Sequence, residues 1–382
     1  MDDPSHSSTL PLLATFPRLG ETVPRLDLGT WPTPVQPAHS FAREMKIGDF
    51  FIKREDRSHA GCGGNKVRGL EFLLADVRRS GAERIVTAGA VGSHHIAKTA
   101  WHAHQLGIAT TAIVIPQPHG QYVGDNLLQG ASIGMDYVPA NLITLGPRMV
   151  VEYLRPAHRT GGRRPYLMAP GGSTPLSCMG HVNAALELKS QINAGLLPIP
   201  ACIFVAMGSI GTAAGLVLGC TLANLPTRVV GVVVSYRWFA TATRCLSLAR
   251  RTLALMRRID PSVPDVAIDR SRVATVVSAL GPGYGHRTEA STRLADTLMS
   301  TENIELDQTY TGKALDGAMQ FIEAEQLRAK VHLFWYTFHG AEPREDRDHL
   351  IHRLPPALRK YVGDAGGAAR FVSPSRAAPV IL

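Results

Sequence analysis

Residues 61–68 have the sequence Gly-Cys-Gly-Gly-Asn-Lys-Val-Arg, and a predicted helix at 66–79 begins on the lysine. Glycines let a backbone pass close to a ligand. A cation is disfavoured at a helix N-terminus, so a lysine there tends toward the neutral amine, the form that makes an imine. Lys66 is therefore a candidate catalytic residue. A surface lysine after a turn is the alternative.

Residues 208–215 (GSIGTAAG) lie between a predicted strand and a predicted helix. Their backbone N–H groups, the Ser209 and Thr212 hydroxyls and the helix N-terminus predict a phosphate cradle. The stretch lacks the lysine of a nucleotide P-loop and the spacing of a dinucleotide fingerprint, and no acidic residue follows about 20 positions on. A small monophosphate fits better than a nucleotide. A tight turn without a ligand is the alternative.

Residues 87–95 (TAGAVGSHH) repeat this pattern of strand, glycine turn and helix start. Ser93 is the predicted N-cap, and such a helix start can bind a substrate carboxylate, although capping alone would explain the serine. His95 and His102 share a helix face, but no acidic or cysteine ligand lies nearby in the sequence. We therefore predict no metal site.

Strands and helices alternate along the chain, which indicates an α/β fold with parallel-rich sheets covered by helices. Residues 1–15 are polar and predicted to be disordered, and the chain beyond Gly340 is predicted to form a surface tail. The predicted strands are 50–53, 85–87, 110–115, 201–207, 229–235 and 332–336, and the predicted helices are 66–79, 93–105, 212–225, 237–258 and 311–327.

The composition excludes several classes of protein. With 382 residues, two domains or one α/β unit with an inserted lobe are expected. Five cysteines without a C-x-x-C pair indicate free thiols rather than zinc or disulfides. The net charge of +9 comes from scattered residues, so we predict anionic small molecules and no nucleic acid as partners. The sequence shows no membrane span and no signal-peptide pattern, which favours the cytoplasm.

Taken together, the stretches resemble the family of D-cysteine desulfhydrases and 1-aminocyclopropane-1-carboxylate deaminases. These are pyridoxal 5'-phosphate (PLP) enzymes of the tryptophan-synthase-β (type II) fold. The resemblance covers about residues 16–340. It rests on 16–18 (FPR), 32–34 (PTP), 52–56 (IKRED), 64–68 (GNKVR), 70–72 (LEF), 93–95 (SHH), 126–128 (NLL), 171–173 (GGS), 208–215 and 310–314 (YTGKA).

The resemblance implies an architecture and a partner. A large PLP-binding domain would comprise residues 1–68 and 178–382, and a smaller inserted α/β domain would comprise 69–177. Residues 341–382 would be an extra C-terminal tail. The cofactor would lie between the domains, and the protein would be a homodimer acting on a small amino acid.

The resemblance also implies roles for single residues. Lys66 would form the imine with PLP and move the Cα proton, and Asn65 belongs to the same motif. Ser93 would contact the substrate carboxylate or assist proton transfer. The phosphate would lie on Gly208, Ser209, Ile210, Gly211 and Thr212, the active-site tyrosines would be Tyr284 and Tyr310, and Thr311 or Thr337 would face the pyridine nitrogen.

Three positions bear on which branch of the family the chain resembles. The deaminases have a glutamate where Thr311 stands, and a neutral hydroxyl favours eliminations, so the desulfhydrases are the closer match. His94 replaces the asparagine that usually bonds the cofactor's ring oxygen, and as a titratable group it could act as an acid or base. Phe338 replaces a glycine near the pyridine nitrogen.

The resemblance therefore implies a PLP-dependent lyase that carries out a desulfhydrase-like β-elimination, giving a keto acid and ammonia. The departures at positions 94 and 338 keep β-replacement, racemisation or another tailoring reaction open. A non-catalytic PLP-binding protein is a further alternative, against which Lys66, Ser93, Tyr284 and Tyr310 argue. A nucleotide-dependent dehydrogenase would rest on the glycine loops alone.

Overall fold

The chain forms two sheets in the computed structural model, which describes residues 10–155, 163–340 and 346–362. The six-stranded sheet has the order β1-β2-β10-β7-β8-β9, and the four-stranded sheet has the order β5-β4-β3-β6. All pairings are parallel except β1 with β2. The predicted α/β class with parallel-rich sheets is confirmed.

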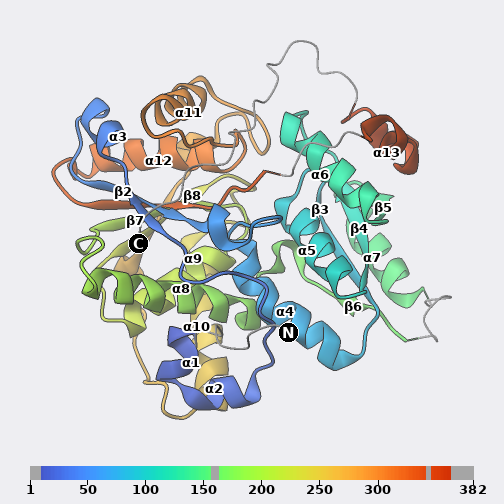
Figure 1. The fold of residues 1–382 in the computed structure, drawn as a ribbon, viewed down its shortest axis with the longest axis horizontal. Helices are drawn as coiled ribbons and strands as arrows, with labels where there is room; N and C mark the ends of the chain where they lie inside the picture. Colours follow the sequence, from blue (N-terminus) through green and yellow to red (C-terminus); the bar gives the residue numbers. More distant parts are fainter. Residues whose placement is uncertain (1–9, 156–162, 341–345, 363–382) are drawn as a thin grey trace, which may run out of the picture.

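The large sheet consists of β1 (Val35–Pro37), β2 (Phe50–Arg54), β7 (Cys202–Met207), β8 (Arg228–Val233), β9 (Val273–Val276) and β10 (His332–Tyr336). The small sheet consists of β3 (Arg84–Ala90), β4 (Ala109–Ile115), β5 (Asp136–Pro139) and β6 (Tyr166–Leu167). The two sheets lie side by side in Figure 1. The domain boundaries at 68/69 and 177/178 stay a prediction.

Helices cover both faces of the large sheet, with α8, α9 and α10 on one side and α11 and α12 on the other (Figure 1). The α-helices are α1 (Pro11–Thr15), α2 (Pro17–Thr22), α3 (His39–Glu44), α4 (Lys66–Ser80), α5 (His94–Gln105), α6 (Gln121–Ser132), α7 (Leu145–Leu154), α8 (Pro175–Asn193), α9 (Gly211–Leu222), α10 (Ala242–Ile259), α11 (Glu289–Glu302), α12 (Thr311–Ala324), α13 (Arg347–Arg353) and α14 (Pro356–Arg359).

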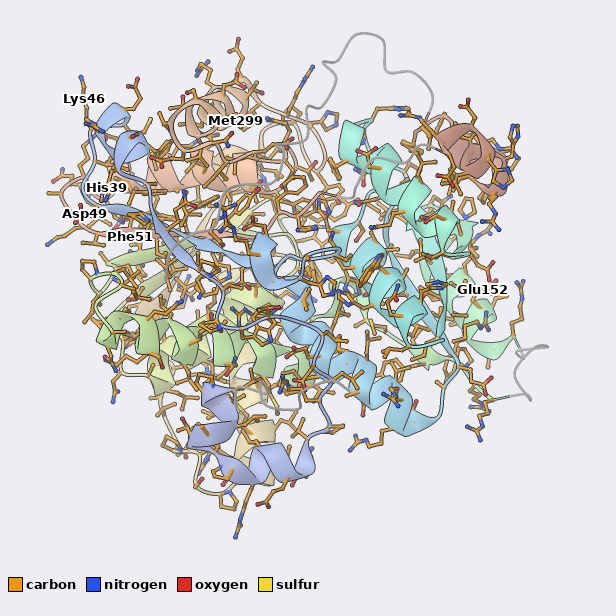
Figure 2. All side chains as sticks on the ribbon, in the orientation of Figure 1. His39, Lys46, Asp49, Phe51, Glu152 and Met299 are labelled. Carbon is orange, nitrogen blue, oxygen red and sulfur yellow. The ribbon has the colours of Figure 1, made fainter. Side chains whose placement is uncertain are left out.

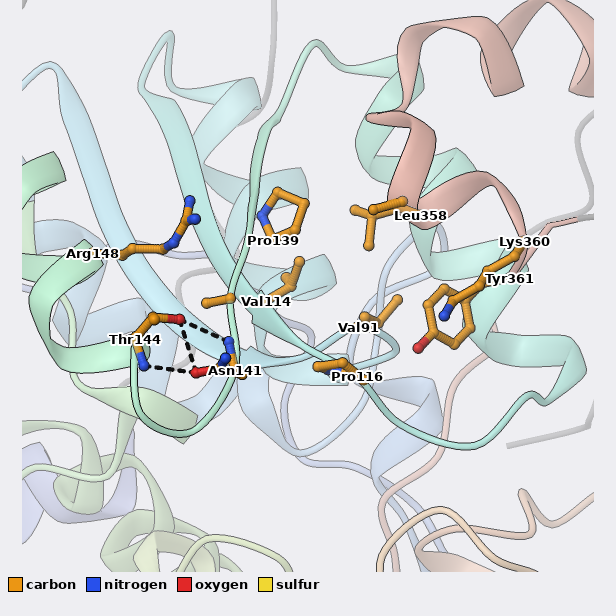
Figure 3. Close-up of a pocket in the computed structure, with 12 residues that line it drawn as sticks. Val91, Val114, Pro116, Pro139, Asn141, Thr144, Arg148, Leu358, Lys360 and Tyr361 are labelled. Carbon is orange, nitrogen blue, oxygen red and sulfur yellow. Dashed lines mark hydrogen bonds between the residues drawn. The ribbon is translucent and has the colours of Figure 1, made fainter.

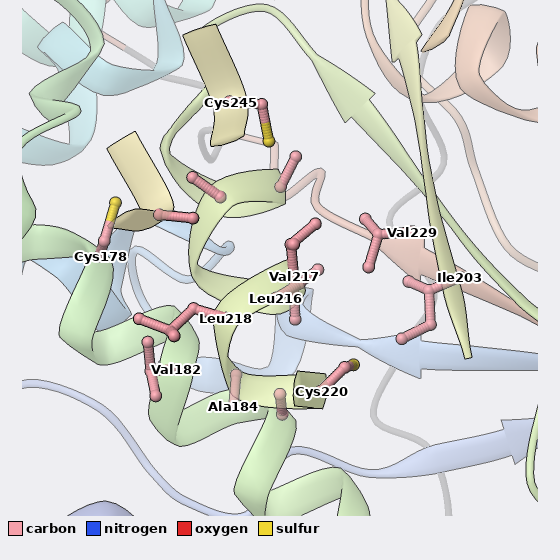
Figure 4. Packing of buried hydrophobic residues seen from close by; sticks show 14 of the residues in the cluster. Cys178, Val182, Ala184, Ile203, Leu216, Val217, Leu218, Cys220, Val229 and Cys245 are labelled. Atoms are coloured by element: carbon pink, nitrogen blue, oxygen red, sulfur yellow. The ribbon is translucent and has the colours of Figure 1, made fainter. Parts of the chain in front are cut away.

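The main core lies between the sheet and helices α8 and α9, where apolar side chains from all three meet (Figure 4). Central strands β7 and β8 are runs of buried apolar residues, as expected for parallel strands covered on both faces. The helices approach closely because α9 carries glycines at the contact. A Cβ on Gly215 would lie 2.4 Å from Cβ of His181. This contact fixes the position of the α9 N-terminus.

A buried ion network joins β2, the turn after it, α4 and α8. Arg68 donates to the Glu55 carboxylate at 2.6 and 2.8 Å and to Glu187 at 3.0 Å. Lys53 Nζ lies 2.5 Å from Glu187. These four side chains are at most 3% exposed, so each charge depends on its partners. The network holds the first turn of α4, two residues from Lys66.

Three expectations about helices are corrected by the structure. The helix expected from Arg237 begins at Ala242, because Thr241 caps it by accepting a hydrogen bond from the Arg244 amide. The two helices expected to end at 225 and 327 end at Leu222 and Ala324.

Residues 10–15 are not disordered. Leu10 and Leu12 are buried, and the Leu12 amide donates to the Asn183 side chain, so α1 is fastened to α8. Residues 1–9 lie outside the described part of the chain.

Residues 346–362 belong to the segment expected as a surface tail, but they contribute to a hydrophobic core. Leu350 on α13, Leu354 directly after it and Leu358 on α14 are buried in the cluster that includes α6 residues. Arg353 donates to the carbonyl of Ala131 at the end of α6. The rest of the predicted tail, 341–345 and 363–382, lies outside the described residues.

Lys46 is an exposed charged side chain at the outside of the molecule in Figure 2, whereas Phe51 on β2 is buried. Among the described residues, no helix combines the length and the apolar character needed to cross a bilayer.

Replacing Arg68 with Met is expected to lower the free energy of unfolding by about 3–5 kcal/mol, because Glu55 and Glu187 would stay buried with one cation fewer. Denaturant unfolding of the purified protein measures this. Arg79→Met on the same helix is the matched control. Its partner is Asp76, and the arginine side chain is 63% exposed, so a loss of about 0–1 kcal/mol is expected. Equal losses in the two variants would contradict the role of the network.

Candidate active site

Lys66 lies at the first residue of α4, facing the N-terminus of α9. Its Nζ atom lies 3.5 Å from Ser209 Oγ. Asn65 Nδ2 donates to Thr212 Oγ1 at 2.8 Å. The two glycine-rich stretches, 143 residues apart in the chain, are therefore brought together as one site.

The space between them is a small cavity lined by the start of α4, the start of α9 and the turn at 171–173. Ser173 Oγ accepts from the Gly211 amide at 3.2 Å, which places this hydroxyl in the cradle. Gly171 has a φ of +71°, and a Cβ there would lie 2.6 Å from Cβ of Ser209. The turn can approach the cradle only with glycine at this position.

The surroundings of Lys66 make its ammonium form easier to deprotonate. Burial removes water from the ammonium form and lowers the pKa of Lys66 to about 8. The residue is only partly buried, so the cavity still gives access to it. A lysine in this state is a better nucleophile at neutral pH than a surface lysine.

His94 sits among three aromatic rings at the start of α5. Its ring centroid lies 5.1 Å from Tyr122, 5.3 Å from Tyr310 and 5.5 Å from Phe338. Burial, together with the positive charges of Lys98 and Lys66, lowers the pKa of His94 to about 3. The imidazole is therefore neutral at physiological pH, which argues against the acid role considered for it.

Tyr284 and Tyr310 form a hydroxyl pair, with their oxygens 2.5 Å apart. Burial raises the pKa of both phenols, so both are neutral. Two residues not singled out from the sequence position them. Asp307 accepts from the Tyr310 amide at 2.7 Å, and Lys313 donates to the carbonyls of Leu280 and Gly283 in the loop that carries Tyr284. Neither shows a sequence signal beyond its place near helix α12.

The two threonines left open by the sequence differ in their surroundings. Thr311 is fully buried, and its hydroxyl donates to the Asp307 carboxylate at 2.7 Å. Thr337 is partly exposed and follows β10, with its carbonyl oxygen 3.1 Å from the position of a Cβ on Gly64. The Thr337 hydroxyl makes no hydrogen bond within the described residues. Thr337 therefore stays the candidate to face the pyridine nitrogen.

Ser93 is the N-cap of α5, as expected, and its hydroxyl accepts from the Ile96 amide at 3.5 Å. Its contact with a substrate stays a prediction. Of the histidines weighed as metal ligands, His102 bonds the Cys62 carbonyl at 3.0 Å. In the part of the chain that the structure describes, no three His, Cys, Asp or Glu side chains gather as a metal site.

A larger cavity of about 350 Å³ lies elsewhere, between the ends of β4 and β5 and the helix α14 (Figure 3). None of the predicted site residues lines it. Its size therefore does not make it the catalytic site, whereas the small cavity holds the reactive amine.

The chain is similar to known proteins over most of its length. The model of the family "Pyridoxal-phosphate dependent enzyme" matches residues 26–337. Nocardicin C-9' epimerase from Nocardia uniformis subsp. tsuyamanensis is 32% identical, over 89% of this chain and 99% of the epimerase. D-cysteine desulfhydrase from Salmonella choleraesuis is 32% identical, over 80% and 90%. The solved structure of an ACC deaminase homologue has a TM-score of 0.72 at 27% identity, over 90% and 99%.

The two threonines can be separated by replacing each with valine. Thr311→Val removes a hydrogen bond to a buried carboxylate and is expected to cost about 1.5–3 kcal/mol of stability. Thr337→Val is expected to change stability by less than about 0.5 kcal/mol but to shift the absorption spectrum of bound PLP. Thermal unfolding and visible absorbance measure the two effects. A spectral shift with Thr311→Val and none with Thr337→Val would reverse the assignment.

Proposed function

The chain belongs to the family of pyridoxal-phosphate-dependent enzymes, of the ACC deaminase and D-cysteine desulfhydrase type, and from this premise we propose that it is a lyase. It would act on a small amino acid by β-elimination and give a keto acid and ammonia. The observation that carries the proposal is the Lys66 amine, held 3.5 Å from the phosphate cradle with its pKa lowered to about 8.

The residues present fit PLP. Lys66 would hold its aldehyde carbon. The cradle from Gly208 to Thr212 and the N-terminus of α9 would hold its phosphate. Thr337 would meet its ring nitrogen. The buried Nε2 atom of His94 has no partner within the described residues, and the ring oxygen of PLP would supply one.

When bound, PLP supplies an electron sink for the charge that develops at the substrate Cα. In this proposal the Lys66 amine takes the Cα proton. The neutral Tyr284–Tyr310 pair gives a proton to the departing β-substituent, which leaves with its electron pair. One water then hydrolyses the released enamine to the keto acid and ammonia. Ser93, at the N-terminus of α5, would bind the substrate carboxylate.

Epimerisation is a second candidate, and a specific observation favours it. Nocardicin C-9' epimerase is similar over 99% of its own length. The site also holds two kinds of proton-handling group, the Lys66 amine and the tyrosine pair, and inversion at Cα needs one proton removed and one returned. The same residues could therefore serve either outcome.

A panel of D- and L-amino acids in deuterated water distinguishes the two candidates. For the lyase, D-cysteine or a related amino acid with a β-leaving group is expected to give keto acid and ammonia in equal amounts. For an epimerase, the opposite enantiomer would appear with deuterium at Cα and without keto acid. Lys66→Ala is the control and is expected to abolish either reaction. Keto acid formed at the parental rate by Lys66→Ala would overturn the proposal.

The pKa of Lys66 gives a separate prediction for the apoprotein. Its neutral amine is the attacking form, so the rate of covalent PLP capture is expected to rise with pH and to level off above about 8. Stopped-flow absorbance, with borohydride fixation and peptide mapping of Lys66, measures it. A rate that keeps rising toward pH 10.5, the ordinary value for lysine, would contradict the lowered pKa.

Two further proposals rest on the family relationship and the composition. The protein would be a homodimer, which light scattering of the purified protein tests. Its compartment would be the cytoplasm. The five cysteines support this, because all are free and buried.

A further inference from the structure

The environment of His94 determines which of its nitrogens carries the proton. Nδ1 lies 3.3 Å from Nδ2 of Asn126 on helix α6. Nε2, on the opposite side of the ring, is buried and has no partner among the described residues. Nδ1 therefore faces α6, whereas Nε2 points away from that helix.

The orientation of the Asn126 amide follows from its second contact. The same Nδ2 atom lies 3.0 Å from the Gly92 carbonyl oxygen, which can only accept a hydrogen bond. The amide nitrogen therefore faces both Gly92 and His94. Turning the amide over would set its oxygen against the Gly92 oxygen.

A donor at Asn126 requires an acceptor at His94 Nδ1. The imidazole is neutral, because burial and the charges of Lys98 and Lys66 disfavour the imidazolium. A neutral imidazole whose Nδ1 accepts must carry its proton on Nε2. The free nitrogen is thus a hydrogen-bond donor.

We propose that Asn126 is a positioning residue that fixes His94 as the Nε2–H tautomer, so that His94 donates a hydrogen bond to the ring oxygen of PLP. This inference rests on the cofactor site of the proposed function. It gives His94 a role different from that of an acid or base. It also assigns a role to Asn126, which contacts His94.

The neighbours of His94 hold the ring in the orientation that this role needs. Tyr122 stacks on it, and the Tyr122 hydroxyl lies 2.6 Å from Thr309 Oγ1. Phe338 packs edge-on against it. Lys98 donates to the His339 carbonyl at 3.0 Å and thereby anchors the loop that carries Phe338.

The C-terminal segment 346–362 packs against helix α6. A Cβ on Gly124 would lie 3.0 Å from the carbonyl oxygen of Tyr361, so the segment 346–362 packs directly on the helix. The C-terminal segment therefore supports the helix that carries both Tyr122 and Asn126.

The direct test is nitrogen NMR of the PLP-loaded protein labelled with ¹⁵N-histidine, with His94→Asn used to assign the signal. The expected result is a protonated Nε2 and an unprotonated Nδ1 near neutral pH. An Nδ1–H tautomer or an imidazolium would overturn the proposal. A parent protein that gains no visible band with PLP would instead overturn the proposed function.

The pH titration of the visible PLP band gives a second test. A donor to the ring oxygen stabilises its negative charge and weakens its hold on the neighbouring imine proton. His94→Leu is therefore expected to raise the midpoint by about one pH unit or more, and Asn126→Leu is expected to raise it by a smaller amount. His94→Asn restores a donor and is expected to keep the parental midpoint.

Gln129→Leu is the matched control for Asn126→Leu, because Gln129 is a buried amide on the same helix and makes no hydrogen bond to His94 among the described residues. Its midpoint is expected to equal that of the parent. Equal midpoints in His94→Leu and the parent, or equal shifts in Gln129→Leu and Asn126→Leu, would overturn the role of this pair.

Discussion

The buried guanidinium of Arg68 is the interaction on which the site depends. It bonds Glu55 and Glu187, and it lies 4.0 Å from the ring centre of Trp31. Burial alone would raise the pKa of Glu187, but Arg68 and Lys53 outweigh it and lower that pKa to about 2. Unpaired charges in such a place cost several kcal/mol, so few arrangements of these groups are tolerated. The first turn of α4, and with it Lys66, is therefore fixed relative to β2 and α8.

Above these buried ion pairs, His94 and the Tyr284–Tyr310 pair are neutral, and Lys66 loses its proton more readily than a surface lysine does. The pKa of Lys66 is lowered to about 8 and that of His94 to about 3, while the tyrosine pair keeps its protons. The phosphate cradle offers amides, hydroxyls and a helix N-terminus rather than a row of cations. Such a site accepts an anionic cofactor through oriented dipoles that are in place beforehand, which costs little rearrangement on binding.

The parts of the site that follow from a continuous stretch were predictable from the sequence. The cradle at 208–212, the N-cap at Ser93 and the helix starting at Lys66 each follow from local rules of turns and helix starts. The contact of Asn126 with His94 spans 32 residues and two helices, and no local pattern predicts it. The two threonines likewise cannot be distinguished from the sequence. Only the structure shows that the Thr311 hydroxyl donates to the Asp307 carboxylate.

The C-terminal helices α13 and α14 were not predicted, because they too depend on contacts with residues distant in the sequence. Leu350, Leu354 and Leu358 are spaced four apart, but their short helices lie in a stretch rich in proline and arginine. Short helices gain their stability from packing rather than from intrinsic propensity, so their partner must be known first. That partner is helix α6, which is distant from these helices in the sequence.

The two departures from the family pattern prove to be one structural unit. In the sequence, His94 in place of an asparagine and Phe338 in place of a glycine look like two independent changes to the site. In the structure their ring centres lie 5.5 Å apart, with Tyr122 and Tyr310 completing the enclosure. An imidazole is larger than an amide, and packing neighbours are needed to fix the orientation of its plane. Phe338 is one of these neighbours. The three aromatic rings thus hold the imidazole that stands in place of the smaller amide.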